Sequence, residues 1–511
     1  MKQTLKLILA LVLVASMAFG MVSCSLLGGL LGGGETPETP DDGGETPDDG
    51  GETPETPATP DQGVDTDKHV IHIGNTAATS GAFASVGVPF NYAQSAYLWY
   101  FETQLGGYTD ADGNKYSFEF HHYDDEFTAA LGKNYTEKLV EEDKVFALVG
   151  HFGSNTVSAT VEYLEETGIP MVYGVCGVSG LYNTEANIMT VQPIYDTEGQ
   201  SMVATAFAPV DAGGLGATKL GVISTSDEAG KGMLNGIEIE VKKLGKESSV
   251  VYQVAGANDT DFSAQVTALK TAGCDVVIIA ANQAPFVAIA NTFVAVAYDN
   301  VKIVTSYVSA NAATMGGLVT TGAISETREV YAGAWLVTGS LPSETKGWTD
   351  FVEYVKVMTM YDAAHNVPLL PNVMMTGYNA DGSTYEYDLL DVYFGTFNME
   401  TFQYERFDWA KDGVSGYFLN SYAMAGYVSA NVFCQGLERM NGKLLTWEGY
   451  IAAMESAPVN VPMGNTVDYS NGNRIGIDAL AVNKYTTANA AAGGEVYRGI
   501  TDLKTLEDAI K

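Results

Sequence analysis

The chain has 511 residues, and its 62 acidic side chains against 26 basic ones give a formal net charge of −36. So acidic a chain argues against nucleic-acid binding, which needs a basic face to meet phosphates. The length exceeds what a single hydrophobic core organises, so it predicts two lobes. Four cysteines in so long a chain are too few for a disulfide framework.

The first residues are typical of a secretory signal. Lys2 and Lys6 precede an apolar run from Leu7 to Val14, and small residues follow it. The apolar run is too short to span a membrane, so we expect residues 1–23 to be a signal peptide.

The end of this segment, Met21-Val22-Ser23-Cys24, resembles the lipobox of bacterial lipoproteins, with Met21 where Leu is usual. The resemblance implies cleavage before Cys24, acylation of its thiol and anchoring to a membrane. The protein would then lie in the cell envelope, in the periplasm or on the outer face of the cell membrane. An ordinary secretory signal with an incidental cysteine is the alternative.

Residues 24–68 are predicted to be the acylated Cys24 and a disordered tether. Glu-Thr-Pro and Asp-Asp-Gly-Gly units fill it, and twelve carboxylates lie between Glu35 and Asp67. Such a segment buries too little apolar surface to offset its conformational entropy, and its charges and prolines keep it extended.

From His69 onward, strand and helix patterns alternate in two series. The first runs to Tyr173, and it places a buried strand at Phe146-Ala147-Leu148-Val149 and a helix over Val157, Val161 and Leu164. The second begins near Lys219 and includes the continuous apolar run Val276-Val277-Ile278-Ile279, typical of a strand covered on both faces. Alternating strands and helices predict parallel sheets, and two series predict two doubly wound α/β lobes. Ligands of such sheets bind at the carboxyl ends of the strands.

Three stretches resemble the branched-chain amino acid type of ABC-transporter solute-binding protein, which has the type I periplasmic binding protein fold. They are Ile71-His72-Ile73-Gly74 through Thr79-Ser80-Gly81, Phe146 through Ser154, and Asp261-Phe262-Ser263 through Asp275. The resemblance implies two Rossmann-like lobes joined by a three-stranded hinge, with crossings near residues 192–195, 333–342 and 465–475. Lobe 1 would comprise residues 69–192 and 340–465, and lobe 2 residues 193–332 and 475–511.

The resemblance also implies a ligand site between the lobes. From lobe 1 it would contain the serine turn Ser154, Asn155 and Thr156, the loop residues Cys176 and Gly177, and Ser80. A helix start offers unpaired N–H groups to an anion, although Ser154 or Asn155 could equally serve as a helix cap. Gly177 stands where a Thr is typical, which removes one side-chain hydrogen bond.

The expected second-lobe residues depart further from the family. Tyr307 replaces the glutamate that binds the ligand ammonium group, Ala229 replaces an aromatic residue, and Asn282 replaces a tyrosine. Glu228 or Asp227 would supply the missing charge, or both are solvated turn residues. The predicted second-lobe ligand residues are Glu228, Asn282 and Tyr307.

Residues 360–412 look unlike the family and contain Asp381-Gly382, which predicts a hairpin. The insertion is either an extra hairpin on lobe 1 or a flap that contributes aromatic contacts to the ligand.

No metal, cofactor or enzymatic activity is expected. Adjacent strand residues such as His121 and His122 point to opposite faces, and no catalytic motif occurs. Cys176 has no nearby base in the sequence. The interpretation is a monomeric receptor that captures a small polar solute, amino-acid-like or related, and delivers it to an ABC permease. A ligand-sensing or envelope-organising lipoprotein on the same fold is the alternative.

Overall fold

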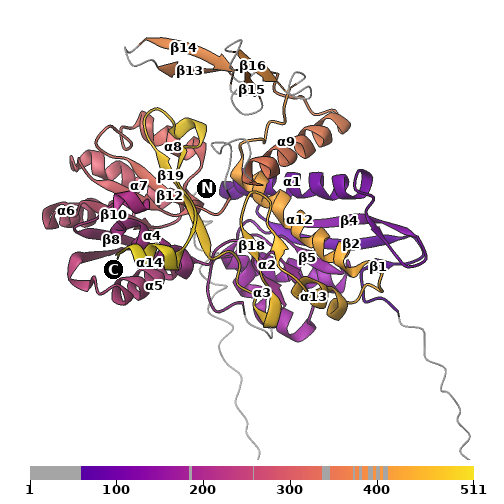
Figure 1. The fold of residues 1–511 in the computed structure, drawn as a ribbon. Helices are drawn as coiled ribbons and strands as arrows, with labels where there is room; N and C mark the ends of the chain where they lie inside the picture. Colours follow the sequence, from indigo (N-terminus) through magenta and orange to yellow (C-terminus); the bar gives the residue numbers. More distant parts are fainter. Residues whose placement is uncertain are drawn as a thin grey trace, which may run out of the picture. The chain divides into compact units, whose positions relative to one another are not determined.

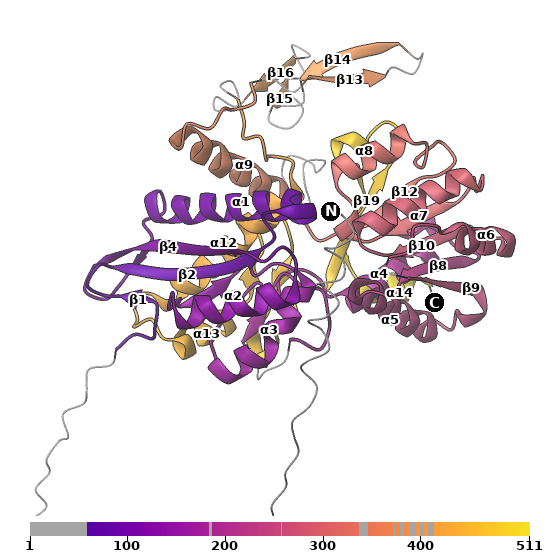
Figure 2. The same ribbon diagram turned by 180° about the vertical axis from the view of Figure 1, so that it is seen from behind.

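The structure, a computed structural model, describes residues 59–182, 187–256, 258–336, 346–371, 374–378, 383–388, 395–398, 403–406 and 413–510. Its folded part contains two large sheets, each covered by helices (Figures 1 and 2). Each sheet with its covering helices is called a lobe below. Among the described residues, no helix is long and apolar enough to cross a membrane.

The first sheet has the strand order β3-β4-β2-β5-β6-β7, with β1 paired to β2. Strands β4, β2, β5, β6 and β7 are parallel, whereas β1 and β3 pair antiparallel at their neighbours. The strands are β1 (Val64–Asp65), β2 (Val70–Ala77), β3 (Tyr108–Thr109), β4 (Lys115–Asp124), β5 (Ala147–Val149), β6 (Met171–Val172) and β7 (Ile188–Met189).

Alternating side chains divide the core of the first lobe between the two faces of this sheet. Ala147 and Val149 of β5 join a cluster with α1, α9 and α12, whereas Leu148 joins a second cluster with α2 and α3. Figure 1 shows these two groups of helices on opposite sides of β2 and β5. The helices are α1 (Ala84–Thr103), α2 (Ala129–Glu141), α3 (Ser154–Thr167), α9 (Lys346–Ala364), α12 (Ser421–Met440) and α13 (Trp447–Glu455).

The second sheet has the order β20-β19-β12-β11-β10-β8-β9, in which β9, β8, β10, β11 and β12 are parallel and β19 and β20 antiparallel. Val277 and Ile279 of β10 face α6, α7 and α8, whereas Val276 and Ile278 face α4 and α5. The elements are α4 (Tyr195–Phe207), β8 (Leu220–Thr225), α5 (Glu228–Lys243), β9 (Val250–Ala255), α6 (Ser263–Ala272), β10 (Val276–Ala280), α7 (Gln283–Ala295), β11 (Lys302–Thr305), α8 (Ala312–Thr320), β12 (Val330–Ala334), β19 (Ala479–Tyr485), β20 (Glu495–Asp502) and α14 (Leu503–Ile510).

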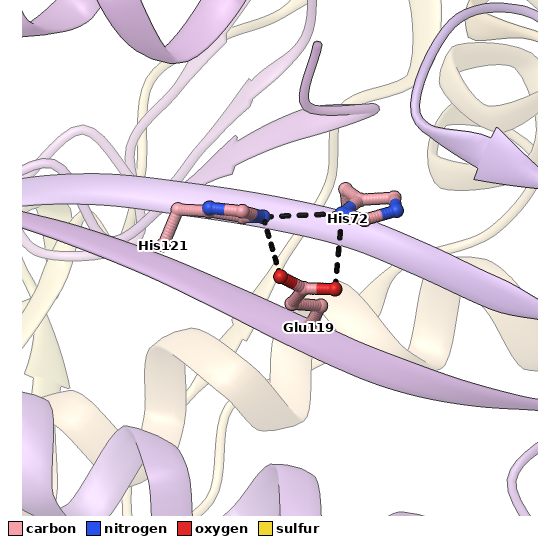
Figure 3. Close-up of side chains that lie close together, drawn as sticks. All are labelled: His72, Glu119 and His121. Atoms are coloured by element: carbon pink, nitrogen blue, oxygen red, sulfur yellow. Dashed lines mark hydrogen bonds and ion pairs between the residues drawn. The ribbon is translucent and has the colours of Figure 1, made fainter. Parts of the chain in front are cut away.

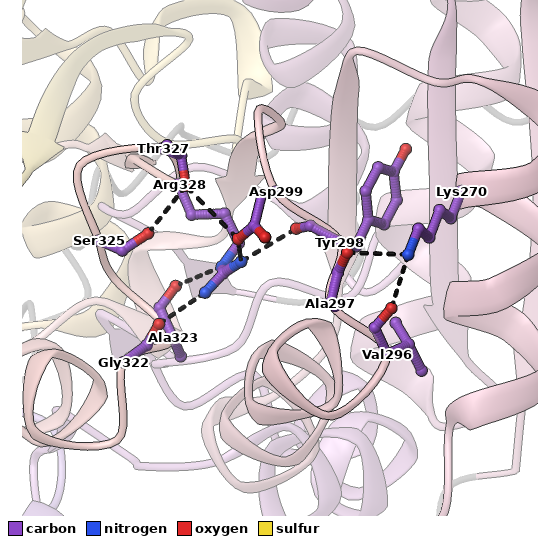
Figure 4. A network of polar contacts seen from close by, with 10 residues as sticks. All are labelled: Lys270, Val296, Ala297, Tyr298, Asp299, Gly322, Ala323, Ser325, Thr327 and Arg328. Atoms are coloured by element: carbon purple, nitrogen blue, oxygen red, sulfur yellow. Dashed lines mark hydrogen bonds and ion pairs between the residues drawn. The ribbon is translucent and has the colours of Figure 1, made fainter.

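A buried arginine, Arg328, links two turns at the amino end of this second sheet. Arg328 is 3% exposed, donates to the carbonyls of Gly322, Ala323 and Tyr298, and pairs with Asp299 at 2.5 Å (Figure 4). Its hydrogen bonds join the turn before β11 to the turn before β12. The carboxyl ends of the same strands lie at the opposite end of the sheet, which is where ligands of such sheets bind.

Two of the three predicted crossings between the lobes lie side by side. Ile477 N–H donates to the carbonyl of Val191 at 2.9 Å, and Thr190 N–H donates to the carbonyl of Arg474 at 3.1 Å. A Cβ on Gly476 would lie 2.4 Å from the Val191 carbonyl oxygen, so the two segments approach too closely for a side chain. Most of the remaining crossing lies in residues 337–345, outside the described residues, and the predicted lobe boundaries stay a prediction.

The predicted end of the tether at Lys68 is too late. Val64 and Asp65 form β1 against β2, and the amide of Gln62 donates to the carbonyls of Val140 and Val145. The Asp61 carboxylate accepts the N–H of Trp447 at 2.7 Å. Most of these residues are polar, but they pair with backbone groups of the first lobe, which composition alone does not reveal.

The inserted region contains two short hairpins rather than one. The first, β13 (Met374–Tyr378) with β14 (Thr384–Asp388), flanks the predicted turn, although Asp381 and Gly382 themselves lie outside the described residues. The second is β15 (Gly395–Asn398) with β16 (Gln403–Arg406). The remaining short elements are β17 (Val459–Asn460), β18 (Thr466–Val467), η1 (Gly81–Phe83), η2 (Val210–Ala212), η3 (Glu247–Ser249), η4 (Tyr307–Ser309), η5 (Ser470–Gly472) and η6 (Ala490–Ala492).

Candidate functional site

Two first-lobe loops lie side by side at the carboxyl ends of β5 and β6. Phe152 bridges to Val175, and Gly153 N–H donates to the Val175 carbonyl at 3.0 Å. The serine turn and the loop with Cys176 and Gly177 therefore meet, as the sequence predicts, because both follow neighbouring parallel strands.

The first turn of α3 is left without a side-chain cap. Gly153 occupies the N-cap position with φ of 114°, and a Cβ there would lie 2.6 Å from the ring of Phe127. A glycine is therefore required, and among the described residues no side chain caps this turn. The α3 start keeps its N–H donors and the positive end of its dipole for an acceptor group. Ser154, the first residue of α3, is half-buried beside them.

Tyr195 takes the space that a larger residue at position 177 would need. A Cβ on Gly177 would lie 2.7 Å from the Tyr195 ring, and Tyr195 N–H donates to the Gly177 carbonyl at 2.6 Å. The Tyr195 hydroxyl lies 3.4 Å from Ser154 Oγ. Position 177 therefore lacks the hydroxyl of the family's threonine, and the Tyr195 side chain places its own hydroxyl beside Ser154.

The second-lobe loops after β8 and β10 are joined by a side-chain hydrogen bond. Asp227 caps α5 by accepting the Gly230 N–H at 2.8 Å, and its second oxygen accepts Asn282 Nδ2 at 3.1 Å. Asn282 precedes α7 but does not cap it. Its amide therefore lies at the strand ends, held by Asp227, with its own oxygen as an acceptor.

The loop after β11 is held by a buried carboxyl group. Glu198 of α4 is fully buried, and its oxygens accept Ser306 Oγ and Tyr307 N–H, each at 2.8 Å. Burial raises the pKa of Glu198 to about 8, although both hydrogen bonds oppose that effect. Glu198 is therefore protonated at neutral pH and supports the backbone that presents Tyr307.

Two tyrosines connect the lobes close to these loops. The Tyr307 hydroxyl donates to the carbonyl of Pro193 in the first crossing at 3.1 Å. The hydroxyl of Tyr422, at the start of α12, lies 3.4 Å from the carbonyl of Val308. Burial raises the pKa of Tyr422 to about 12, so its hydroxyl stays a donor at physiological pH.

Four of the predicted ligand residues, Ser80, Asn155, Thr156 and Glu228, are exposed or already bonded to other groups of the chain. The Ser80 side chain is exposed and forms a hydrogen bond with the Asp124 carboxylate. Burial alone would raise the pKa of Asp124, but the hydrogen bonds from Ser80 and from backbone N–H groups outweigh burial and lower that pKa. Asn155 is exposed, and the buried Thr156 hydroxyl bonds to the carbonyls of Phe152 and Gly153. Glu228 is exposed and pairs with Lys231 at 3.0 Å, so its charge is already compensated.

Cys176 is buried rather than displayed. It is 1% exposed, and burial raises the pKa of its thiol above the ordinary value. A buried, protonated thiol is a small packing group and a poor nucleophile. Cys274 and Cys434 are also free and buried.

Sequence reasoning missed Tyr195, Glu198 and Tyr422. Each lies inside a segment with an ordinary helical pattern, and no motif marks it. Acidic Glu198 on an otherwise apolar helix face was the single available signal, because a carboxyl group at a core position needs a partner.

Two surface hollows lie elsewhere and share no residue with the predicted ligand set. One of about 300 Å³ is lined by Tyr108, Asp110 and Glu438 among others, and one of about 410 Å³ by Asp275 and Glu329 among others. The place where the loops at the carboxyl ends of the strands lie together remains the better candidate for the ligand site, because the topology of both sheets predicts a site there.

The sequence matches the periplasmic binding protein family over residues 70–332, which is half of the chain. An amino acid binding protein of Pseudomonas aeruginosa is 29% identical over 140 residues, 27% of this chain and 36% of that protein. The match thus spans about a third of that curated relative.

Solved structures share the whole architecture at low sequence identity. A fatty acid ABC transporter substrate-binding protein from Thermomonospora curvata has a TM-score of 0.61 at 16% identity, covering 88% of this chain and 96% of that one. A branched-chain amino acid transporter substrate-binding protein of Streptococcus pneumoniae, in complex with isoleucine, has a TM-score of 0.58 at 15% identity, covering 84% and 100%. At these identities the likeness shows the fold.

Two mainly parallel sheets with helices on both faces, joined by repeated crossings, define a two-lobed binding protein of the type I periplasmic class. The chain belongs to the periplasmic binding protein family. The resemblance and the fold class predicted from the sequence are confirmed. Family membership implies a ligand-binding role outside the cytoplasm.

Proposed function

We propose that the chain captures a small polar organic solute, amino-acid-like or related, and delivers it to an ABC importer. The observation that carries this proposal is the uncapped start of α3, with Ser154 beside Tyr195, next to the loop of Cys176 and Gly177. These groups are donors that are already oriented before a ligand arrives, which lowers the entropic cost of binding.

The first-lobe donors suit a carboxylate or an amide oxygen of the solute. Helix N-termini favour negative charge, and a hydroxyl adds a directed hydrogen bond. The similar proteins described above include an amino acid binding protein, a fatty acid transporter protein and a protein in complex with isoleucine, and these three kinds of solute share a carboxyl group. The second lobe offers Asn282 and the ring of Tyr307, whose hydroxyl donates to Pro193 and can only accept from a ligand. It therefore favours a polar or aromatic portion over a bare ammonium group.

Closure of the lobes is the proposed mechanism of capture. Only a closed arrangement lets residues of both lobes touch one solute, so binding shifts the population toward it. Tyr195 follows the first crossing and contacts both the Gly177 loop and Gly232 of α5. Movement of the chain at this crossing would therefore shift the ligand loops directly.

Anchoring through Cys24 is part of the proposal. A lipid on Cys24 followed by an acidic, proline-rich tether would hold the lobes near the membrane that contains the permease. A solute captured by the lobes would then stay within reach of its transporter.

Mass spectrometry of the purified chain under native conditions tests the proposal, because a captured solute co-purifies and is released on denaturation. Calorimetry with that solute then compares Ser154→Ala with Ser263→Ala, a helix-start serine of α6 outside the site. We expect only Ser154→Ala to weaken binding. Equal affinity of both variants would place the site elsewhere.

A further inference from the structure

Two histidines and a glutamate converge on one face of the first sheet, away from the ligand loops. Strands β2 and β4 are parallel, and their register sets His72 opposite Glu119. Glu119 and His121 are two residues apart on β4, so their side chains share a face. Figure 3 shows the three side chains pointing toward one another across the two strands.

The three side chains hold their possible ligand atoms close together, with one atom from each within 4.8 Å of the others. His72 Nδ1 lies 3.1 Å from His121 Nε2. Glu119 Oε2 lies 3.6 Å from His72 Nδ1, and Glu119 Oε1 lies 3.7 Å from His121 Nε2. A tetrahedral zinc ion with bonds of about 2.1 Å needs ligand atoms about 3.4 Å apart. The two nitrogens are within a few tenths of an ångström of that spacing, and each Glu119 oxygen is so from one nitrogen. Rotation of the exposed Glu119 carboxylate would bring one oxygen to this distance from both nitrogens.

The surroundings also suit a bound cation. The histidine side chains are 24% and 21% exposed, whereas Glu119 is 59% exposed and gives the ion a path from solvent. On the far side of His121, Nδ1 lies 3.9 Å from an oxygen of Asp143, whose other oxygen accepts the Tyr123 hydroxyl at 2.9 Å. A carboxylate that accepts the other N–H of a metal-binding imidazole orients the ring, and a small rotation of the Asp143 side chain would bring it within hydrogen-bond distance.

We propose that His72, Glu119 and His121 bind one Zn²⁺ ion, with Asp143 as the outer partner of His121. Imidazole and carboxylate ligands suit zinc, whereas Ca²⁺ and Mg²⁺ take oxygen ligands in larger number. Three protein ligands leave a fourth position for water. The ion would join β2 to β4 at residues upstream of the ligand loops, so this site does not depend on the proposed function.

Titration of the metal-free chain with ZnCl₂, followed by calorimetry, tests the site. We expect one ion per chain and a higher melting temperature with zinc. His121→Gln and Glu119→Gln should each weaken binding by about tenfold or more, since even outer-shell changes weaken metal affinity about 10- to 100-fold. Glu119→Gln provides a variant at an exposed position, whose folding is checked by circular dichroism.

His365→Gln is the matched control, because His365 is exposed in the turn directly after α9 and outside the cluster. It should bind zinc like the unmodified chain, and an excess of Mg²⁺ should not displace the ion. Co²⁺ in place of zinc should give the visible absorption bands of a tetrahedral site. The proposal is overturned if the chain takes up no zinc, if zinc binding survives a His72→Gln/His121→Gln double substitution, or if His365→Gln weakens it equally.

Discussion

Replacing Glu198 by glutamine tests the most unusual carboxyl group of the second lobe. Glu198 is fully buried, and its two oxygens hold Ser306 Oγ and the N–H of Tyr307. Glutamine has nearly the same shape, and its amide oxygen can accept one of these hydrogen bonds while its NH₂ group donates to Ser306 Oγ. The substitution therefore keeps the packing and removes the ionisable proton.

The sign of the pH effect follows from the raised pKa. The folded chain holds the Glu198 proton up to a pKa of about 8, whereas the ordinary value is 4.5. Folding therefore takes up a proton between these values, and the free energy of unfolding falls as pH rises through this window. The loss is on the order of 1 kcal/mol for each pH unit and on the order of 5 kcal/mol across the window. The stability is fully present below pH 4.5.

Urea denaturation at pH 5, 6, 7 and 8 gives the free energy of unfolding of Glu198→Gln and of the unmodified chain. The difference between the two values isolates Glu198, because the contributions of the other titrating groups cancel. We expect similar stability at pH 5, within about 1 kcal/mol for the exchanged hydrogen bond, and an increasing advantage of the variant toward pH 8. Glu228→Gln is the control, because Glu228 is exposed and should show no such trend. A difference that stays constant from pH 5 to pH 8 would mean that Glu198 is ionised in the folded chain.

Three further substitutions address the anchor and the site. Cys24→Ala should release the protein from membranes without changing its melting temperature, and unchanged membrane partitioning would contradict the lipid anchor. Ser154→Ala should weaken solute binding by about 1–2 kcal/mol in calorimetry, or more for a charged acceptor. Gly177→Thr should lower the free energy of unfolding by about 1–3 kcal/mol, because its Cβ would lie 2.7 Å from the Tyr195 ring. Adding Tyr195→Ala should restore part of that loss; a stable Gly177→Thr variant would show that the Tyr195 ring moves freely.

Much of the fold is readable in the sequence because the patterns that encode it are local. The apolar run Val276–Ala280 predicts a strand covered on both faces, and β10 lies between α4 and α5 on one face and α6 and α7 on the other. The spacing of Val157, Val161 and Leu164 likewise predicts a helix after a buried strand, and the family resemblance implies that it starts at Ser154, which α3 confirms. A strand or helix carries its own period, so one stretch of chain suffices to recognise it.

The polar contacts could not be predicted because their partners lie far apart in the chain. Glu198 meets Ser306 and Tyr307 over more than 100 residues, and Tyr195 of α4 fills the space beside Gly177 in the loop after β6. The sequence predicts no metal site at His121, because the adjacent His122 points to the other face, but His121 contacts His72, which lies 49 residues away in the chain.

The sequence by itself therefore determined the two α/β lobes and the strand ends where a ligand would bind. The tertiary structure decided which side chains meet there, because strand register and helix packing bring distant residues together and leave no trace in local periodicity.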